Sequence, residues 1–477
     1  MRSLTFFGAV GGAVVPSRYL LKGNNCRDSI LVECGALIDD NAKKRGKEAR
    51  QDFAHLDPRS VGQILISHGH TDHGGALTGF IEQGCRANIT STDPTKDILE
   101  AMLRHNHNNG RVDNVFDHYG KPREYLDEFQ VEDGVYATFY PAQGHILGAS
   151  SILLRLEKEN LRVLFSGDLG NTNKYMLDTS GDPPEADIVI MESTYGDREH
   201  HPDFKQSLSD MHREVNESHS KRGNSILPVL SIHKLQEGLF HVNEARRNGE
   251  IPRSINMVVE TKLGEAITKI YAKNKNRKYF SERAQEYFSN PLGIKPFDCS
   301  EEINPGGRNI ILTSSGLDGL RGRFCQHFSE LSDERNSIIV TTYKIPGSPL
   351  DDIAKGKRHI GTNGRSIEIN AQSLDLPGIS SHCDATQAIN WLRKTKAKFI
   401  ILVHGEKPGI AGLKELIVRS GICPEKNILT PSLYDEFDLS NLQRSNGTYS
   451  AHPTPVLEQK PQITLMGHKI DLTLSGK

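Results

Sequence analysis

The chain has 477 residues, of which 36% are hydrophobic and 25% are charged, and its formal net charge is −2. This length is too great for one small domain and sufficient for two or three domains with cores of their own. The near-neutral charge excludes a general basic field for nucleic acid, and seven cysteines without a C-x-x-C pair indicate reduced thiols rather than a disulfide framework.

The N-terminal stretch of residues 4–15 is apolar enough to be compared with the core of a signal peptide. However, Gly8, Gly11 and Gly12 interrupt it, and it is too short to span a bilayer. Residues 4–8 are better interpreted as the first strand of a domain. We therefore expect no membrane segment and a cytoplasmic protein.

A dense group of metal-binding side chains follows the apolar run of residues 64–66, which predicts a buried strand leading into a turn. Within six residues come His68, His70, Asp72 and His73. The first two histidines can face one side of the turn, and the adjacent aspartate and histidine can reach a second point. Imidazole suits zinc and other borderline metals, and a carboxylate suits a harder neighbour, so we predict two adjacent ions. The alternative, a polar loop with scattered histidines, is disfavoured because this pattern rarely follows a strand by chance.

The rest of the first 195 residues alternates short apolar strands with glycine turns. Strands are predicted at residues 4–8, 19–21, 30–35, 137–140, 151–156 and 162–165, and helices at residues 74–80 and 95–105. Many strands with interspersed helices, and metal ligands at strand ends, favour an αββα sandwich.

Further ligand candidates lie in three later turns. His145 stands between two predicted strands, Asp168 follows the strand at residues 162–165, and His404 follows an apolar run at residues 399–403. In two-metal hydrolases a carboxylate or water bridges ions about 3.5–4 Å apart. Each of these residues alone could be an ordinary turn residue; together they supply the ligands that two ions need.

Residues 200–365 have a different pattern, in which longer helices alternate with strands. Helices are predicted at residues 204–220, 234–248, 262–273 and 281–289, and strands at residues 225–229, 256–259, 310–312 and 337–340. This alternation predicts a doubly wound α/β unit with a parallel sheet. After residue 366, short strands return with a helix at residues 385–395. A polar linker at residues 440–450 leads to a hairpin of strands at residues 462–466 and 469–472.

Several motifs resemble the β-CASP nucleases, a branch of the metallo-β-lactamase superfamily whose signature is H-x-H-x-D-H. Residues 191–198, Met-Glu-Ser-Thr-Tyr-Gly-Asp-Arg, resemble the E-S-T-Y-G-D-R motif that ends the lactamase-like half in this group. Further motifs of the group, S-S-G-M-L, Y-Q-x-P-G-T and S-A-H-A-D, are similar to residues 313–317, 343–348 and 380–384. The resemblance covers nearly all of residues 1–440.

The resemblance implies a metallo-β-lactamase αββα sandwich with an inserted β-CASP α/β domain. The expected boundaries are residues 1–198 and 366–440 for the two parts of the lactamase domain, 199–365 for the β-CASP domain and 441–477 for a linker and strand-like tail.

The resemblance also implies roles for the site residues. His68, His70 and His145 match ligands of one ion, Asp72 and His73 match ligands of the other, Asp168 matches the bridge and His404 matches the last ligand. Two Zn²⁺ ions, with Mn²⁺ as the alternative, would activate a bridging water and offset charge on a phosphodiester.

Three residues are assigned to catalysis. Asp72 would help to orient the nucleophile. His382 would protonate the leaving group or stabilise the phosphate, and Glu192 would position His382.

The function implied is that of a zinc-dependent ribonuclease of RNA processing, similar to the endonuclease of mRNA cleavage and polyadenylation and its prokaryotic relatives. The active site is expected at the interface of the lactamase-like and β-CASP domains, with single-stranded RNA as substrate and a homodimer or a processing-complex protein as partner. A DNA nuclease of the same fold is an alternative, although the DNA-repair branch usually lacks a histidine at the position of His404. A non-catalytic scaffold subunit is another, disfavoured because every expected ligand is present.

Some residues depart from the family's motifs. Glu33 replaces an aspartate that would orient a histidine ligand. His233 and Lys234 stand where glycine and arginine are usual, and residues 317–321 also differ. Because His233, Lys234 and residues 317–321 belong to segments that line the family's RNA cleft, they bear on substrate preference.

Three other features are interpreted without a functional role. Residues 105–109 are expected to form a polar loop, and His200 and His201 to be exposed near the domain junction. The basic run at residues 269–278 is expected to be a solvated helix face.

Overall fold

The structure of the chain is a computed structural model. It describes residues 2–14, 16–22, 29–36, 53, 55–288, 297, 299, 302–314, 323–344, 347–362, 365–439, 462–465 and 468–471. The predicted linker at residues 440–450, most of the 441–477 tail, residues 315–321 and residues 345–346 of the motifs lie outside this range. Of the helices in the described part, none is both long enough and apolar enough to cross a membrane.

Two sheets packed face to face form the first body of the fold, called the sandwich below. One sheet has six strands in the order β20-β1-β2-β3-β4-β5. Its strands are β1 (Ser3–Phe6), β2 (Tyr19–Leu21), β3 (Ser29–Val32), β4 (Val61–Leu65), β5 (Asn88–Thr90) and β20 (Glu436–Asp438). Because β20 pairs with β1, a strand from the C-terminal part of the described chain completes the N-terminal sheet.

The second sheet of the sandwich has seven strands in the order β19-β18-β10-β9-β8-β7-β6. They are β6 (Phe129–Glu132), β7 (Val135–Pro141), β8 (Ser150–Leu156), β9 (Leu161–Phe165), β10 (Ile188–Glu192), β18 (Phe399–Val403) and β19 (Ile428–Leu429). Alternate side chains of each strand point to opposite faces, so Leu4 and Phe6 of one sheet meet Ile152, Phe165 and Ile190 of the other in one buried core.

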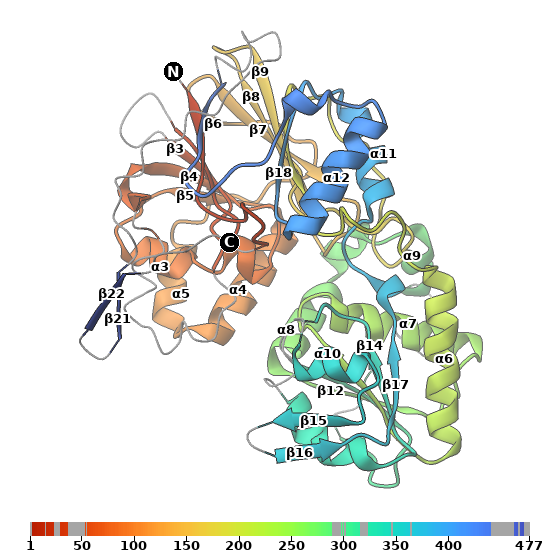
Figure 1. Cartoon of the computed structure of the whole chain (residues 1–477). Coiled ribbons are helices and arrows are strands. Elements are labelled where there is room, and N and C mark those ends of the chain that lie inside the picture. Colours follow the sequence, from red (N-terminus) through yellow and green to blue (C-terminus); the bar gives the residue numbers. More distant parts are fainter. Residues whose placement is uncertain are drawn as a thin grey trace.

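Helices cover the outer faces of the two sheets (Figure 1). On the six-stranded sheet lie α3 (Leu77–Glu82), α4 (Asp93–Asn106) and α5 (Asn109–Phe116); on the other lie α11 (Ala385–Thr395) and α12 (Lys407–Arg419). The short helix α2 (Thr71–Gly74) stands between β4 and α3 in the chain. The four layers are therefore the αββα sandwich expected from the sequence. Residues 105–109 do not form the expected loop, because α4 continues to Asn106 and Asn108 caps α5 by accepting a hydrogen bond from the backbone of Arg111.

A third sheet and its helices form a second body, called the inserted unit below. Its five strands are parallel, in the order β12-β13-β11-β14-β17. They are β11 (Ser225–Val229), β12 (Asn256–Glu260), β13 (Asn309–Ser314), β14 (Ser337–Val340) and β17 (Gln372–Asp375). β17 belongs to this sheet although it follows residue 365, where the sequence placed the end of the inserted domain; the domain boundaries stay a prediction.

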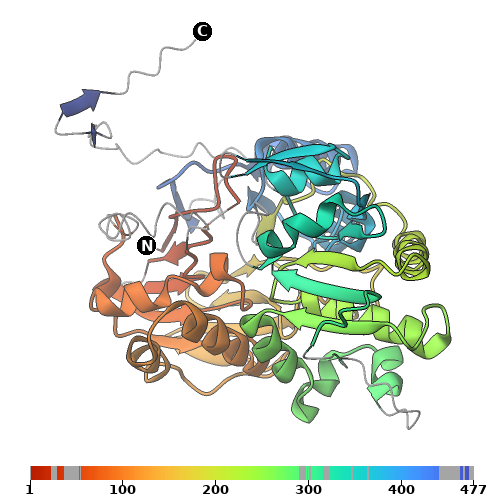
Figure 2. The same cartoon turned by 90° about the horizontal axis from the view of Figure 1, so that it is seen from below.

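Both faces of the third sheet are buried, as the alternation of helix and strand predicted. Leu227 faces a core with α6 (Phe204–Ser220) and α7 (Lys234–Asn248), whereas its neighbour Ile226 faces a core with the 3₁₀ helix η4 (Phe324–Ser332) and α10 (Pro349–Ala354). The sandwich and the inserted unit lie side by side (Figure 2). The remaining elements are α8 (Lys262–Tyr271), η3 (Asn274–Tyr279), α9 (Glu282–Phe288), the 3₁₀ turns η2 (Pro58–Ser60), η5 (Pro377–Ile379) and η6 (Glu425–Asn427), and the antiparallel pairs β15 (His359–Thr362) with β16 (Arg365–Glu368) and β21 (Gln462–Leu465) with β22 (His468–Asp471).

The basic run at residues 269–278 connects the two bodies. Lys275 lies 2.7 Å from Asp93 and 2.9 Å from Asp97 of α4, and Lys273 lies 2.8 Å from Asp97. Lys278 pairs with Glu124. The run is therefore not simply a solvated helix face: its lysines pair with carboxylates of the sandwich.

Candidate active site

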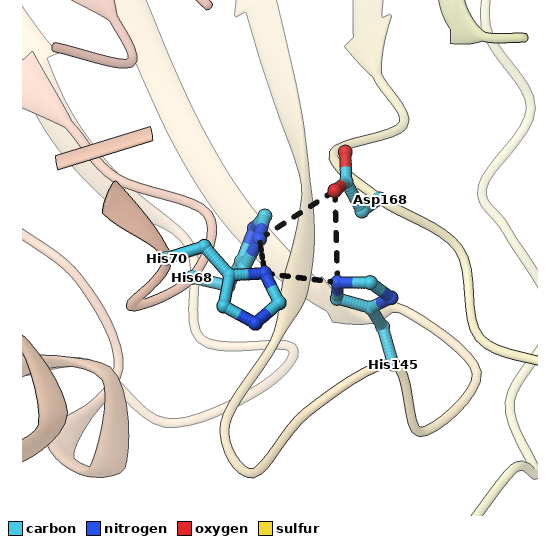
Figure 3. Close-up of side chains that lie close together, drawn as sticks. All are labelled: His68, His70, His145 and Asp168. Carbon is cyan, nitrogen blue, oxygen red and sulfur yellow. Dashed lines mark hydrogen bonds and ion pairs between the residues drawn. The ribbon is translucent and has the colours of Figure 1, made fainter. Parts of the chain in front are cut away.

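The first group of ligand candidates gathers at the end of β4. His68 and His70 lie in the turn between β4 and α2, and the Nε2 atom of His68 lies 2.9 Å from Nδ1 of His70. Nε2 of His145 lies 3.3 Å from the same atom of His70. Both Nε2 atoms lie 3.6 Å from Oδ2 of Asp168. Figure 3 shows the three imidazoles and this carboxylate facing one another.

The second group lies on the other side of Asp168. Oδ1 of Asp168 lies 3.3 Å from Nε2 of His73 and 3.6 Å from Nδ1 of His404. Oδ2 of Asp72 lies 3.3 Å from Nε2 of His404 and 3.7 Å from Nε2 of His73. Within each group the candidate ligand atoms lie within 4.8 Å of one another. Asp168 thus offers one oxygen to each group.

The loops that carry these ligands are held close together by their backbones. A β-carbon at Gly170 would lie 2.0 Å from the carbonyl oxygen of Gln143, so only glycine lets the loop after Asp168 pass the loop of His145. Nδ1 of His145 meets the carbonyl oxygen of Ser381 at 3.3 Å, and Nδ1 of His68 meets Oγ of Ser67 at 2.9 Å. These contacts leave the Nε2 atoms of both histidines facing the cluster.

A bound metal would satisfy the ligand candidates better than the hydrogen bonds that they can make to one another. Both ring nitrogens of His73 and Oδ1 of Asp168 are buried without a hydrogen-bond partner among the described residues, and such groups need a partner in a folded protein. Burial lowers the pKa of His70 to about 4 and the pKa values of His68 and His145 well below the usual range, so these imidazoles are neutral. Neutral imidazoles and carboxylates are the deprotonated forms that bind metals.

Charges within the second group also favour a cation. Although burial opposes ionisation, His404 and His73 hold the pKa of Asp168 well below its usual range. Although burial opposes the charged imidazole, Asp168 raises the pKa values of His73 and His404. The carboxylates of Asp72 and Asp168 are therefore stable only with positive charge beside them, which metal ions or protons can provide.

Glu33 occupies the position expected of a carboxylate that orients a ligand. Its Oε1 lies 3.4 Å from Nδ1 of His73, and its Oε2 accepts a hydrogen bond of 3.2 Å from the backbone of Ser67. Its φ of 66° lies in the left-handed region, which is uncommon for a residue other than glycine. The longer side chain thus contacts both the strand end and a ligand candidate.

His382 and Glu192 lie together beside the cluster, as their predicted roles require. Nδ1 of His382 lies 3.2 Å from Oε1 of Glu192, and its Nε2 lies 3.9 Å from Oδ2 of Asp168. Oε1 of Glu192 also accepts a hydrogen bond of 2.8 Å from the backbone of Leu169. With 21% of its side chain exposed, His382 can face both the cluster and a bound molecule.

One contact near His382 was not predicted from the sequence. His201, expected to be exposed, is buried, and its Nε2 lies 2.9 Å from the carbonyl oxygen of His382. Its backbone donates to Asp384 at 3.0 Å. Of two adjacent histidines, nothing in the local pattern indicated which one faces inward; His200 is the exposed one.

Two families match this chain. Residues 12–207 match the metallo-beta-lactamase superfamily, and residues 366–431 match a family described as Zn-dependent metallo-hydrolase RNA specificity domain. The two matched segments contain all seven predicted metal ligands, His382 and Glu192.

Relatives match over most of the chain. "Ribonuclease TTHA0252" of Thermus thermophilus is 26% identical over 437 residues, which cover 87% of this chain and 96% of the relative. "RNase J-like protein" of Methanocaldococcus jannaschii is 27% identical over 79% of this chain and 87% of the relative. "Endoribonuclease YSH1" of Mycosarcoma maydis is 26% identical over 75% of this chain and 43% of that longer relative.

A solved structure supports the fold alone. A protein of unknown function from Enterococcus faecalis V583 matches 91% of this chain and 99% of its own with a TM-score of 0.52 and 13% identity.

Proposed function

The chain belongs to the metallo-β-lactamase superfamily, and from this premise we propose that it is a metal-dependent ribonuclease. It hydrolyses phosphodiester bonds of RNA where the sandwich meets the inserted unit. The observation that carries the proposal is the pair of histidine and aspartate groups that share Asp168, with His382 beside them. The ribonuclease names of its relatives support RNA as the substrate.

Two ions fit the ligand set. His68, His70, His145 and Asp168 would hold one, and Asp72, His73, His404 and Asp168 would hold the other. Three imidazoles in one group and two carboxylates in the other suit Zn²⁺, with Mn²⁺ as the alternative. When bound, such ions supply an activated water and positive charge for the phosphate.

The remaining steps belong to the chain's own residues. Glu192 accepts a hydrogen bond from Nδ1 of His382, which leaves Nε2 turned toward Asp168. In this orientation Nε2 can donate a proton to the oxygen that leaves the phosphorus, and Glu192 stabilises the ring while it does so. Asp72 and Asp168 fix the position of the attacking oxygen relative to the phosphate.

The test compares one sequence made as labelled RNA and as labelled single-stranded DNA, each incubated with the zinc-loaded protein. An Asp72→Ala variant serves as the control. We expect loss of the RNA alone, absent in the variant, and the product ladder distinguishes internal from terminal cutting. Cleavage of DNA alone would favour a DNA nuclease of the same fold, and cleavage of neither would favour a scaffold subunit. The homodimer, a processing partner and the cellular location stay predictions.

A further inference from the structure

A second cluster of buried charges lies where the inserted unit meets the loops of the active site. It consists of Lys174, from the sandwich, and His233, Lys234 and Glu237, from the start of α7; all four are buried. The two ammonium groups each lie 2.7 Å from a different oxygen of Glu237. Nε2 of His233 lies 3.2 Å from Nζ of Lys174. We call these four residues the Glu237 cluster.

One contact of the Glu237 cluster reaches the loop of His382. Nζ of Lys234 donates a hydrogen bond to the carbonyl oxygen of Ile379, the last residue of η5, three positions before His382. From the sandwich, the backbone of Asn171 donates a hydrogen bond to the carbonyl oxygen of Ser381 at 3.2 Å, and its side chain donates to the carbonyl oxygen of Ser380 at 3.4 Å. The loop is therefore held both by the sandwich and by Lys234 of the inserted unit.

A second contact reaches the loop of His145. Nδ1 of His233 lies 3.1 Å from the hydroxyl of Tyr271, the last residue of α8. The same hydroxyl accepts a hydrogen bond of 3.1 Å from the backbone of Leu147, two positions after His145. Tyr271 is itself buried. One connected group of polar side chains, all from the inserted unit except Lys174, thus contacts both loops.

A contribution to stability does not explain why these charged groups are buried here. Replacing a buried ion pair by apolar residues of similar volume is often neutral or stabilising, so such clusters give little net stability. Their contribution is geometric, because a buried charged hydrogen bond fixes the position of its partner. His233 also has a φ of 70°, an uncommon conformation that the surrounding contacts maintain.

We propose that Lys234 and Tyr271 are positioning residues, through which the inserted unit sets the loops of His382 and His145. The effect of Lys234 on turnover rests on the proposed function. The positioning of the loops does not, and it can be measured without metal or substrate.

The first test measures backbone hydrogen exchange in the metal-free protein. Lys234→Met keeps the length of the side chain without its charge, and we expect faster exchange at residues 376–385. Tyr271→Phe removes one hydroxyl from an otherwise unchanged ring, and we expect faster exchange at residues 145–149. The control, Lys221→Met, changes an exposed lysine of the same unit and should alter neither segment. Unchanged exchange in both loops of the folded variants would overturn the proposal, and Tyr271→Phe keeps the test decisive if Lys234→Met does not fold.

The second test asks whether Lys234 acts through His382. Displacing a reacting group by about 1 Å can cost about 100-fold in rate, so Lys234→Met should lower kcat by about 10-fold or more, with KM and zinc content nearly unchanged. In an His382→Ala background the same change should lower kcat less than about 2-fold, because residues that act together are not additive. An equal loss in both backgrounds would contradict the assignment. A wild-type protein that cleaves no RNA would refute the proposed function, while the exchange result would still decide the positioning.

Discussion

Two buried polar clusters lie close to each other in this molecule, and they are satisfied in different ways. In the Glu237 cluster, opposite charges meet at 2.7 Å, and the lysines lower the pKa of Glu237 although burial opposes its charge. In the histidine and aspartate cluster, imidazoles face imidazoles, and buried atoms of His73 and Asp168 have no hydrogen-bond partner among the described residues. In the first cluster each oxygen of Glu237 has an ammonium group of the chain itself beside it; the second needs a cation from outside. We therefore expect loss of a charge to lower the stability of the fold in the first cluster, and to remove metal and activity in the second.

The largest effect is expected for Asp168→Ala, because this carboxylate serves both ligand groups. RNA cleavage should fall by more than about 1,000-fold, since the ions contribute several kcal/mol to the transition state. Bound zinc, measured by mass spectrometry of the desalted protein, should fall below two per chain. Asp182→Ala, at an exposed aspartate paired with Lys394, should change neither quantity; full zinc content in Asp168→Ala would remove it as the bridge.

His382 lies beside the histidine and aspartate cluster, on the loop that Lys234 contacts, and should affect only turnover. His382→Ala should lower kcat by about 100-fold or more, the usual contribution of a positioned acid or base. Bound zinc should stay near the wild-type amount, because His382 belongs to neither ligand group. Unchanged turnover would show that the proton comes from another group.

Glu237→Gln should lower the free energy of unfolding without affecting metal binding directly. Two buried ammonium groups would lose their shared carboxylate, and breaking a buried ion pair costs about 3–5 kcal/mol. Urea unfolding of the metal-free protein measures this loss. The matched control is Glu217→Gln, an exposed glutamate of α6, for which we expect a change of less than about 0.5 kcal/mol; equal stability of the two variants would contradict the difference between buried and exposed charges.

Zinc should stabilise the fold through one cluster only. A site filled at 100 times its Kd adds about 2.7 kcal/mol to the free energy of unfolding, so the melting temperature of the chelator-treated protein should rise when zinc is returned. Glu237→Gln should retain this gain and Asp168→Ala should lose most of it. The same gain in all three proteins would place the stabilising zinc elsewhere.

The smallest effect is expected at the exposed pairs between α4 and the inserted unit. Lys275 is 45% exposed, and exposed ion pairs contribute about 0–1 kcal/mol. Lys275→Ala should therefore lower the free energy of unfolding by at most about 1 kcal/mol, and less in high salt. A loss as large as that of Glu237→Gln would mean that this pair, rather than the buried cluster, joins the two bodies.

The sequence predicted best those features that depend on neighbours along the chain. The helices at residues 204–220, 234–248 and 385–395 and the strand at residues 399–403 coincide with those observed, because hydrophobic periodicity is a local signal. All seven ligand candidates come together for a related reason: each follows a strand, and the strand ends of the sandwich meet at one edge.

Features that depend on distant packing were not predicted. Helix α12 was not predicted because it contains Pro408, Gly409 and Gly412, and proline and glycine have low helix propensity. In the structure a β-carbon at Gly409 would lie 2.4 Å from the carbonyl oxygen of Ser193, so the glycine serves close packing rather than a turn. The Glu237 cluster could not be predicted either, because Lys174 stands about 60 positions before its partners in the chain.

We have proposed that two ions, held by seven side chains, make this chain a ribonuclease. The most direct test of this proposal is a stepwise titration of the metal-free protein with zinc, in which bound zinc and cleavage of labelled RNA are followed together. We expect two zinc ions per chain, with cleavage appearing as the second ion binds. Full activity at one ion per chain, or two bound ions without cleavage of RNA, would contradict it.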